Sequence, residues 1–367
     1  MPAAAGNGLP VTLAETARIY LRPVGLACGN TAEKFLAAGQ AKRLAGGPWV
    51  FAACEVAVRA PEGIEGIRRA VASLAEIEAW VDRLAPRLRD GLSAQLGRLT
   101  GPRVAPGGGP LERPLIMSVV DASSDPEAAV AQGRHLAAAG ADILEIGGEF
   151  ESTAGSTLGV ARLRPVLQGL AADPSLRRLV LSIDTRDLEI LAEGLTAGAT
   201  VINSLPAPAG SPRILAAIAE SEAQVVLTHG RSESGATSHD PRPADTPFEV
   251  FDVLETRIDA CVAAGIPRAR LIVDPGLGFG KRAEDDLAIL RTLALYHGLG
   301  CPILLDVARE DAAGELDRAF PPRGRLPGSL AAAVHALDQG VQILKVRDVA
   351  DFRQALDLWR RLTGLAE

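Results

Sequence analysis

Eight short apolar runs, each followed by a longer amphipathic stretch, constrain the fold of this chain more than any other feature of its sequence. The apolar runs are Leu115–Asp121, Ile143–Gly147, Leu179–Asp184, Thr200–Asn203, Val225–His229, Leu271–Asp274, Ile303–Val307 and Val341–Val346. Helical spacing follows them in Ala128–Ala139, Val160–Ala171, Leu188–Ala197, Arg213–Ser221, Phe248–Ala264, Asp285–Leu299, Ser329–Gln339 and Ala350–Leu362. Near-continuous apolar strands that alternate with helices indicate a parallel sheet covered by helices. Eight such units in about 250 residues predict an α/β fold, a (β/α)8 TIM barrel. A doubly wound open sheet stays the alternative, because periodicity does not show whether a sheet closes.

The first hundred residues follow a different pattern. Ile19–Gly25 and Trp49–Arg59 read as strands, and the apolar positions from Leu74 to Leu99 have helical spacing. The stretch Gly101–Pro114 is rich in glycine and proline and has no periodicity, which is typical of a linker. We therefore expect an N-terminal α+β extension over residues 1–100, a linker over 101–112 and the barrel over 113–367.

Composition excludes several classes of function. The chain has 367 residues, 47% of them hydrophobic, and a net charge of −7 from 38 basic and 45 acidic residues. It has no basic tract and only 4% aromatic residues, so we expect no nucleic-acid partner and no membrane partner. The four cysteines lack the spacing of a disulfide framework or a zinc site. No apolar run approaches the roughly 18 residues of a membrane helix, and we expect a cytoplasmic protein.

Polar residues end nearly every predicted barrel strand. They are Asp121, Glu145, Asp184, Asn203, His229, Asp274, Asp306 with Arg309, and Lys345 with Arg347. Sites in parallel α/β folds lie at the carboxyl ends of the strands, although a single acid there is more often a helix cap. So many polar ends together suit a small polar ligand that donates hydrogen bonds and carries negative charge. We expect His229 to be a packed residue lining the mouth, and the polar segment Gly230–Pro247 to be a lid or a surface loop.

The sixth strand continues into the sequence DPGLGFGK (274–281), in which three glycines turn the chain toward Lys281. With this motif the chain resembles the pterin-binding family that includes dihydropteroate synthase. The other matching motifs are, in order, RPLIMSVVD (113–121), ADILEIGGE (141–149), LSIDT (181–185), TVIN (200–203), VVLTHG (225–230), RLPGSLAAAV (325–334) and KVRDV (345–349). The resemblance extends over all eight predicted units.

The resemblance implies a barrel that forms a homodimer and a transferase reaction of folate biosynthesis. The synthase condenses 6-hydroxymethyl-7,8-dihydropterin pyrophosphate with p-aminobenzoate, and releases pyrophosphate with Mg²⁺ present. Asp184, Asn203 and Asp274 fall on the family's pterin ligands, and Gly278 and Lys281 belong to the same pterin-binding motif. Asp121 falls on the position associated with the metal, where a carboxylate could hold Mg²⁺. Lys345 and Arg347 fall where cations would stabilise the departing pyrophosphate.

Departures from the family pattern leave alternatives open. The loops after the first two strands are shorter than in the synthases, Asn203 is followed by Ser204, and Glu310 stands where the family has a pterin-contacting lysine. Only four of the 38 basic residues are lysines, which indicates a bias toward arginine. Such a bias would replace the family's lysine with arginine, so it does not explain a glutamate at that position. A pterin-binding paralogue without synthase activity and a pterin-dependent methyltransferase therefore remain alternative functions.

Overall fold

The computed structural model describes residues 8–10, 12–60, 66–122, 125–147, 155–185, 187–203, 212–230, 245–279, 281–307 and 325–365. Glu310, Ser204, Arg309, most of the loop after the second barrel strand and residues 231–244 of the predicted lid lie outside these ranges. Within the described part of the chain, no helix is long and apolar enough to span a bilayer.

Eight parallel strands form the barrel, as the sequence predicts. Their order is β11-β10-β9-β8-β7-β6-β13-β12, and neighbouring strands in this order pair in parallel. The two end strands meet where the Val273 amide donates to the Pro302 carbonyl at 2.9 Å, so the sheet closes and the open alternative is wrong. The strands are β6 (Leu115–Asp121), β7 (Ile143–Gly147), β8 (Val180–Asp184), β9 (Val201–Asn203), β10 (Gln224–Thr228), β11 (Leu271–Asp274), β12 (Leu304–Asp306) and β13 (Ile343–Lys345).

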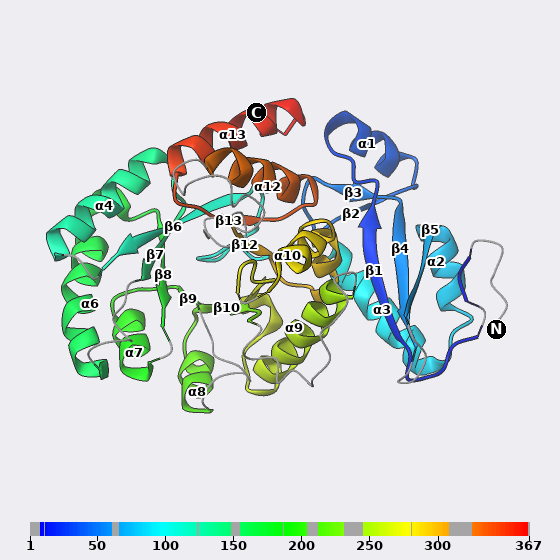
Figure 1. The fold of residues 1–367 in the computed structure, drawn as a ribbon, viewed down its shortest axis with the longest axis horizontal. Helices are drawn as coiled ribbons and strands as arrows, with labels where there is room; N and C mark the ends of the chain where they lie inside the picture. The colour runs from blue at the N-terminus through cyan, green and yellow to red at the C-terminus, as the bar shows by residue number, and fades with distance from the viewer. Residues whose placement is uncertain are drawn as a thin grey trace.

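Helices surround these strands (Figure 1). They are α4 (Pro126–Ala139), α6 (Gly155–Ala172), α7 (Leu188–Thr196), α8 (Pro212–Glu220), α9 (Thr246–Ala263), α10 (Ala283–Leu290), α12 (Leu326–Asp338) and α13 (Val349–Leu362), with short 3₁₀ helices η1 (Pro174–Leu176), η3 (Arg268–Arg270) and η4 (Leu293–Leu299). The carboxylates of Asp125 and Asp187 accept backbone N–H groups in the first turns of α4 and α7, which fixes where these helices begin.

One predicted barrel helix is wrong in its length. The expected helix Asp285–Leu299 is divided, because α10 ends at Leu290 and η4 follows as a 3₁₀ helix. Every residue of η4 is buried, so the segment has no polar face. A helical stripe cannot be recognised in such a segment, and its apolar residues continued the pattern of α10 without a visible break.

The N-terminal residues form an antiparallel sheet with strand order β1-β4-β5, namely β1 (Arg18–Val24), β4 (Ala53–Arg59) and β5 (Ile67–Ser73). Around it lie α1 (Gly29–Ala37), the short strands β2 (Lys42–Arg43) and β3 (Val50–Phe51), α2 (Leu74–Val81) and α3 (Pro86–Thr100). The predicted strand Trp49–Arg59 is therefore interrupted. The single helix expected between Leu74 and Leu99 is also divided, since Pro86 begins a new helix and favours its first turn.

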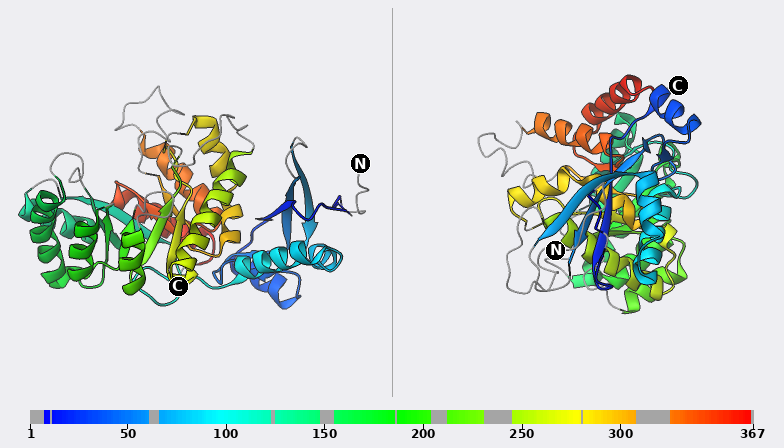
Figure 2. Two further views of the ribbon diagram at one scale, coloured as in Figure 1. Left: turned by 90° about the horizontal axis from the view of Figure 1, so that it is seen from below. Right: turned by 90° about the vertical axis from the view of Figure 1, so that its right-hand side faces the viewer.

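The N-terminal sheet packs against α9 and η4 of the barrel, and both parts share one continuous apolar core (Figures 1 and 2). The ring of Tyr20 lies 4.9 Å from that of Phe248 and 5.6 Å from that of Phe251, centroid to centroid. Between the two parts, the guanidinium of buried Arg103 donates to the carbonyls of Gly101, Arg98, His297 and Cys301. This side chain anchors the connecting segment. The division at residues 100 and 112 stays a prediction.

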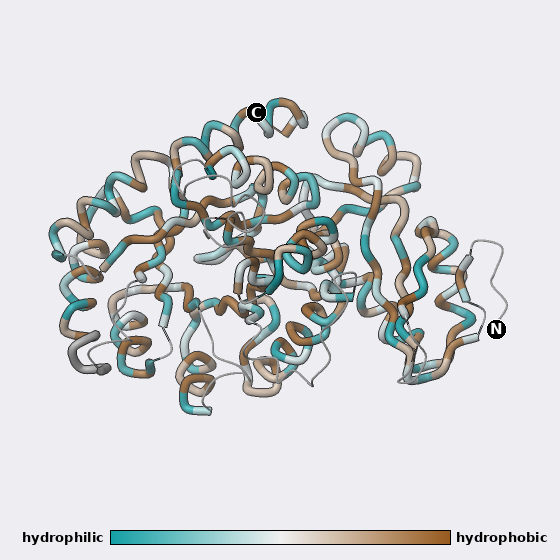
Figure 3. The backbone as a smooth tube through the Cα atoms, viewed as in Figure 1, coloured by the Kyte–Doolittle hydropathy of each residue, from teal (hydrophilic) through white to brown (hydrophobic). Residues whose placement is uncertain are grey.

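The interior of the barrel is apolar in the amino-terminal half of the strands. Seven buried side chains, one from each strand except β8, form a separate cluster there: Met117, Ile143, Val201, Val226, Ile272, Leu304 and Ile343. Figure 3 shows the apolar segments concentrated in the strands, whereas the outer helices alternate between polar and apolar residues. Because side chains alternate along a strand, the residue two positions after each cluster member also points inward, toward the carboxyl end.

Candidate active site

Polar side chains occupy the layer directly above the apolar cluster. Two positions after the cluster residues come Val119, Glu145, Asn203, Thr228, Asp274, Asp306 and Lys345. All of them except Val119 are polar, and Asp184 of β8 lies in register beside Asn203. The fold therefore gathers the predicted strand-end residues Asp184, Asn203, Asp274 and Lys345 at one end of the barrel.

Glu145 on β7 connects two of these residues, one on β9 and one on β13, which are the second strands away on either side. Its Oε1 accepts a hydrogen bond from the Lys345 ammonium, and its Oε2 accepts one from the Asn203 amide. The Lys345 Nζ also lies 3.6 Å from Asp306 Oδ2. Burial alone would lower the pKa of Lys345, but Glu145 and Asp306 outweigh burial and raise it above the ordinary lysine value. Lys345 is therefore protonated at neutral pH.

Asp274 is a buried carboxylate held by two donors. Its Oδ1 accepts the Gly276 N–H at 2.8 Å, and its Oδ2 accepts the Thr228 hydroxyl at 3.3 Å. Burial raises the pKa of Asp274 to about 6, and Asp306 adds to this effect, while the Gly276 N–H and the two lysines oppose it. The group is mostly ionised at neutral pH and can still accept hydrogen bonds from a ligand.

The loop after β11 is held tightly from within. The Lys281 ammonium donates to the carbonyls of Gly276 at 2.5 Å and His229 at 3.2 Å, and burial lowers its pKa to about 8. Gly276 has φ +71°, and a Cβ there would lie 2.0 Å from the His229 carbonyl oxygen, so only glycine fits. The Gly278 N–H donates to Asp286 Oδ2 in the first turn of α10 at 2.9 Å.

His229 is packed at the mouth, as the sequence predicts. Its side chain is buried, and its backbone N–H donates to the Asp274 carbonyl at 2.9 Å. Burial, together with the nearby charges of Lys281 and Arg257, lowers the pKa of His229 to about 3. The imidazole is therefore neutral throughout the physiological range.

Asp121 and Arg347 lie at the rim. Both are exposed, and both line a cavity of about 500 Å³ whose walls also include Asp306 and Lys345. Asp121 is thus near the two predicted cations Lys345 and Arg347, whereas Lys281 and Gly278 belong to the β11 loop. The cavity is large enough for a small polar ligand.

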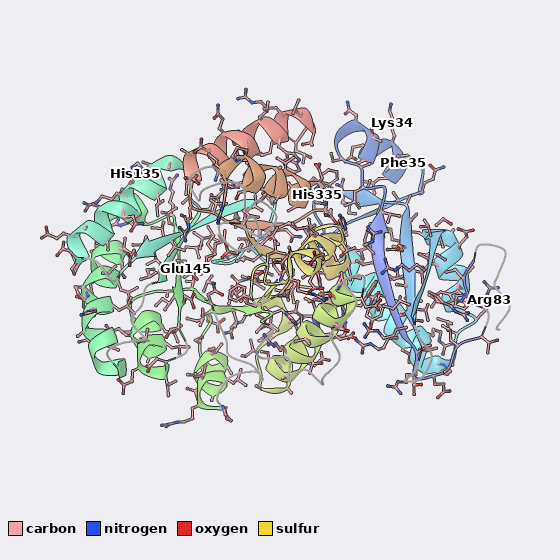
Figure 4. All side chains as sticks on the ribbon, viewed as in Figure 1. Lys34, Phe35, Arg83, His135, Glu145 and His335 are labelled. Atoms are coloured by element: carbon pink, nitrogen blue, oxygen red, sulfur yellow. The ribbon has the colours of Figure 1, made fainter. Side chains whose placement is uncertain are left out.

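Three residues at this end carry contacts that sequence reasoning did not assign. The sequence predicts Glu145 and Asp306 as strand ends but does not predict their contacts with Lys345, and it does not predict Thr228 as a partner of Asp274. The three residues share one sequence signal. Each lies two positions after an inward-facing apolar residue of its strand, so its side chain points into the barrel as well. In Figure 4 Glu145 lies at the strands, inside the helices that carry His135 and His335.

Comparison with known proteins identifies the family. The sequence profile described as pterin binding enzyme matches residues 118–347, a range that includes Asp121, Asp184, Asn203, Asp274, Lys345 and Arg347. The chain belongs to this pterin-binding enzyme family. The family match begins within β6, so the N-terminal sheet lies outside it.

Individual members of the pterin-binding family are similar over most of the barrel. The dihydropteroate synthase of Neisseria meningitidis serogroup B is 32% identical over 273 residues, which cover 69% of this chain and 94% of that protein. The Escherichia coli K12 dihydropteroate synthase is 32% identical over 222 residues, covering 59% of this chain and 77% of that protein. The solved structure of Xanthomonas albilineans dihydropteroate synthase in complex with 7,8-dihydropteroate is 35% identical, with a TM-score of 0.63 over 72% of this chain and all of that one.

Proposed function

We propose that this pterin-binding enzyme is a dihydropteroate synthase, which joins 6-hydroxymethyl-7,8-dihydropterin pyrophosphate to p-aminobenzoate in folate biosynthesis. The observation that carries the proposal is the layer of buried acceptors, Asp274 and Asn203 foremost, at the carboxyl end of a barrel similar to those of synthases. Solved synthases support both substrates, since the Xanthomonas albilineans enzyme has been captured with 4-aminobenzoic acid and the Thermus thermophilus enzyme with 6HMPPP.

The pterin would bind through its polar edge. The 2-amino-4-oxo face of a pterin presents adjacent N–H donors, which suit the ionised carboxylate of Asp274. Asn203 and Asp184, neighbours in register on β9 and β8, would form hydrogen bonds with the remaining ring nitrogens. Gly278 and Lys281 would act by shaping the β11 loop, because Lys281 donates to backbone carbonyls beside Asp274.

The reaction would be a displacement at the pterin's exocyclic methylene. The arylamine nitrogen forms the new C–N bond, the C–O bond to pyrophosphate breaks, and the nitrogen loses a proton. Arg347 at the rim and the Lys345 ammonium would stabilise the charge that develops on the departing pyrophosphate. Catalysis then comes mainly from orientation and electrostatic stabilisation.

Asp121 fits the manner in which Mg²⁺ binds with a phosphorylated substrate. The described residues contain no cluster of three or more side chains able to hold a metal. Mg²⁺ is commonly held by one or two carboxylates together with substrate phosphates and water, and the exposed Asp121 on the cavity wall supplies one such carboxylate. When bound there, Mg²⁺ would neutralise charge on the pyrophosphate.

We further propose a cytoplasmic homodimer. The four cysteines, at positions 28, 54, 261 and 301, are free thiols, which supports a reducing compartment. The surface of α13 exposes Leu358 and Leu362 one turn apart, and apolar side chains of this kind support an interface between copies. Sedimentation of the purified chain should give twice the monomer mass; a monomer at micromolar concentration would contradict the proposal.

Calorimetric titration tests the activity. We expect the pterin pyrophosphate to bind with higher affinity in the presence of Mg²⁺, and addition of p-aminobenzoate to yield dihydropteroate and pyrophosphate. Tight pterin binding without turnover would instead establish a pterin-binding paralogue. Methyl transfer from a methylated tetrahydropterin to an added corrinoid would establish a methyltransferase.

A further inference from the structure

Among the described residues at the carboxyl end of the barrel, Glu145 is the most completely buried charged side chain, with 1% of its surface exposed. The carboxylate lies between β13 on one side and β9 on the other, and it reaches across one intervening strand in each direction. Its two oxygens are divided between two partners, since Lys345 donates to Oε1 and Asn203 donates to Oε2. A buried carboxylate is stable only when donors satisfy it, and these two donors do so.

The contact with Asn203 determines which way its amide faces. Burial raises the pKa of Glu145, and the adjacent Lys345 ammonium opposes this effect and favours the ionised form. The ionised carboxylate only accepts hydrogen bonds, so the NH₂ group of Asn203 faces it. The carbonyl Oδ1 lies in the same plane on the other side of Cγ and therefore faces away from the Glu145 carboxylate.

We propose that Glu145 is a positioning residue that makes Asn203 present an acceptor, rather than a donor, to the pterin. The inference rests on the proposed function and goes beyond it by naming the residue that sets the hydrogen-bond polarity of the site. The Lys345 ammonium completes the arrangement, because it compensates the negative charge of Glu145 and lies between this residue and Asp306. Glu145 therefore acts on the pterin through Asn203 and not by direct contact.

The test is a double-mutant cycle measured by pterin binding. Glu145→Gln keeps the size of the side chain but turns one acceptor into a donor, so either Asn203 or Lys345 faces an N–H group. We expect the dissociation constant for the pterin pyrophosphate to rise about 10- to 100-fold, with the KM for p-aminobenzoate changed less than about twofold. In an Asn203→Ala background, the same Glu145→Gln substitution should weaken pterin binding by less than about twofold.

Two further variants keep the test decisive. Asp142→Asn is the matched control, because Asp142 precedes the opposite end of the same strand and accepts from Arg113 at 2.6 Å and Arg353 at 2.8 Å. It should lower stability and leave pterin affinity unchanged. Glu145→Asp retains the carboxylate but cannot span both partners, so it should show a partial loss of affinity; it replaces Glu145→Gln in the cycle if that variant does not fold.

The outcomes separate this inference from the proposed function. Two results would overturn the role of Glu145. One is unchanged pterin affinity in Glu145→Gln, and the other is a loss of affinity from Glu145→Gln that is as large in the Asn203→Ala background as in the unaltered chain. Pterin binding by the unaltered chain without turnover would refute the synthase activity, while the cycle would still decide the role of Glu145. Failure of the unaltered chain to bind any pterin would overturn both.

Discussion

At the scale of single residues, the site depends on carboxylates that the fold keeps out of water. Asp274 is 3% exposed, and its oxygens are directed by the Gly276 N–H and the Thr228 hydroxyl. A ligand with adjacent N–H donors replaces the water that such a group has lost, and this exchange favours polar heterocycles over apolar rings.

Asp274→Asn should therefore impair pterin binding. The variant places an NH₂ group toward the ligand's donors, and we expect a loss of about 3 kcal/mol, which is roughly 100-fold in dissociation constant. Titration calorimetry at pH 7.5 measures it. Asp173→Asn is the matched control, since Asp173 is a buried acid paired with Arg134 outside the site; equal affinity of the Asp274 variant and the unaltered chain would remove Asp274 from the pterin site.

The raised pKa of Asp274 also predicts how stability changes with pH. The carboxyl binds its proton more tightly in the folded chain, with a pKa of about 6, than in the unfolded chain, with a pKa of about 4. Its contribution to stability is thus complete below about pH 4 and is lost as the pH rises through about 6. Relative to the unaltered chain, Asp274→Asn should gain about 2 kcal/mol between pH 4 and pH 7. Urea unfolding of both proteins at the two pH values measures this, and a constant difference would contradict it.

At the scale of elements, the loop after β11 is specified by close approach of backbone to backbone. The positive φ of Gly276 and the short distance from its would-be Cβ to the His229 carbonyl leave no space for a side chain. The loop then returns to α10, where Asp286 accepts the Gly278 N–H. Gly276 is therefore required by the backbone geometry of the loop, and the Asp274 carboxylate at the start of the motif is available to bind the ligand.

Gly276→Ala should destabilise the chain more than an alanine at another left-handed glycine. We expect a loss of about 3 kcal/mol in the free energy of unfolding, from the strained φ and the steric overlap together. Gly39→Ala is the control, because Gly39 has φ +66° but no atom within 4 Å of the added Cβ. It should cost only about 1 kcal/mol. Equal losses in urea unfolding would show that the contact with His229 is not restrictive.

At the scale of the whole molecule, the N-terminal sheet is joined to the barrel by a polar cluster at α9. Asp252 accepts from the guanidinium groups of Arg18 and Arg59, at 2.5 and 2.6 Å, and from the Tyr20 hydroxyl at 2.9 Å. Glu255 on the next turn accepts from Arg18 and Arg98. We propose that the extension over residues 1–100 stabilises the barrel along α9 and thereby supports the site.

Asp252→Ala should lower stability, because it leaves three donors at the contact without their shared acceptor. We expect a loss of about 2 kcal/mol, smaller in 1 M salt. Asp259→Ala is the control on the same helix, where the carboxylate is 64% exposed and pairs with Arg268 at 3.1 Å. Its loss should stay below about 0.5 kcal/mol. Identical unfolding curves for the two variants would indicate that the sheet does not stabilise the barrel through Asp252.

Periodicity and motif order were sufficient to predict the eight barrel strands, their helices and the carboxyl-end position of Asp184, Asn203, Asp274 and Lys345. These features are local, since a strand between two layers of apolar packing must itself be apolar, and a polar residue at its end marks the edge of that packing. Closure of the sheet, the division between α10 and η4, and the contacts of Glu145 were decided only by the tertiary structure. Each depends on which residues meet across the barrel, and a carboxylate that joins β9 to β13 acquires its partners only when the intervening strands bring them within hydrogen-bond distance.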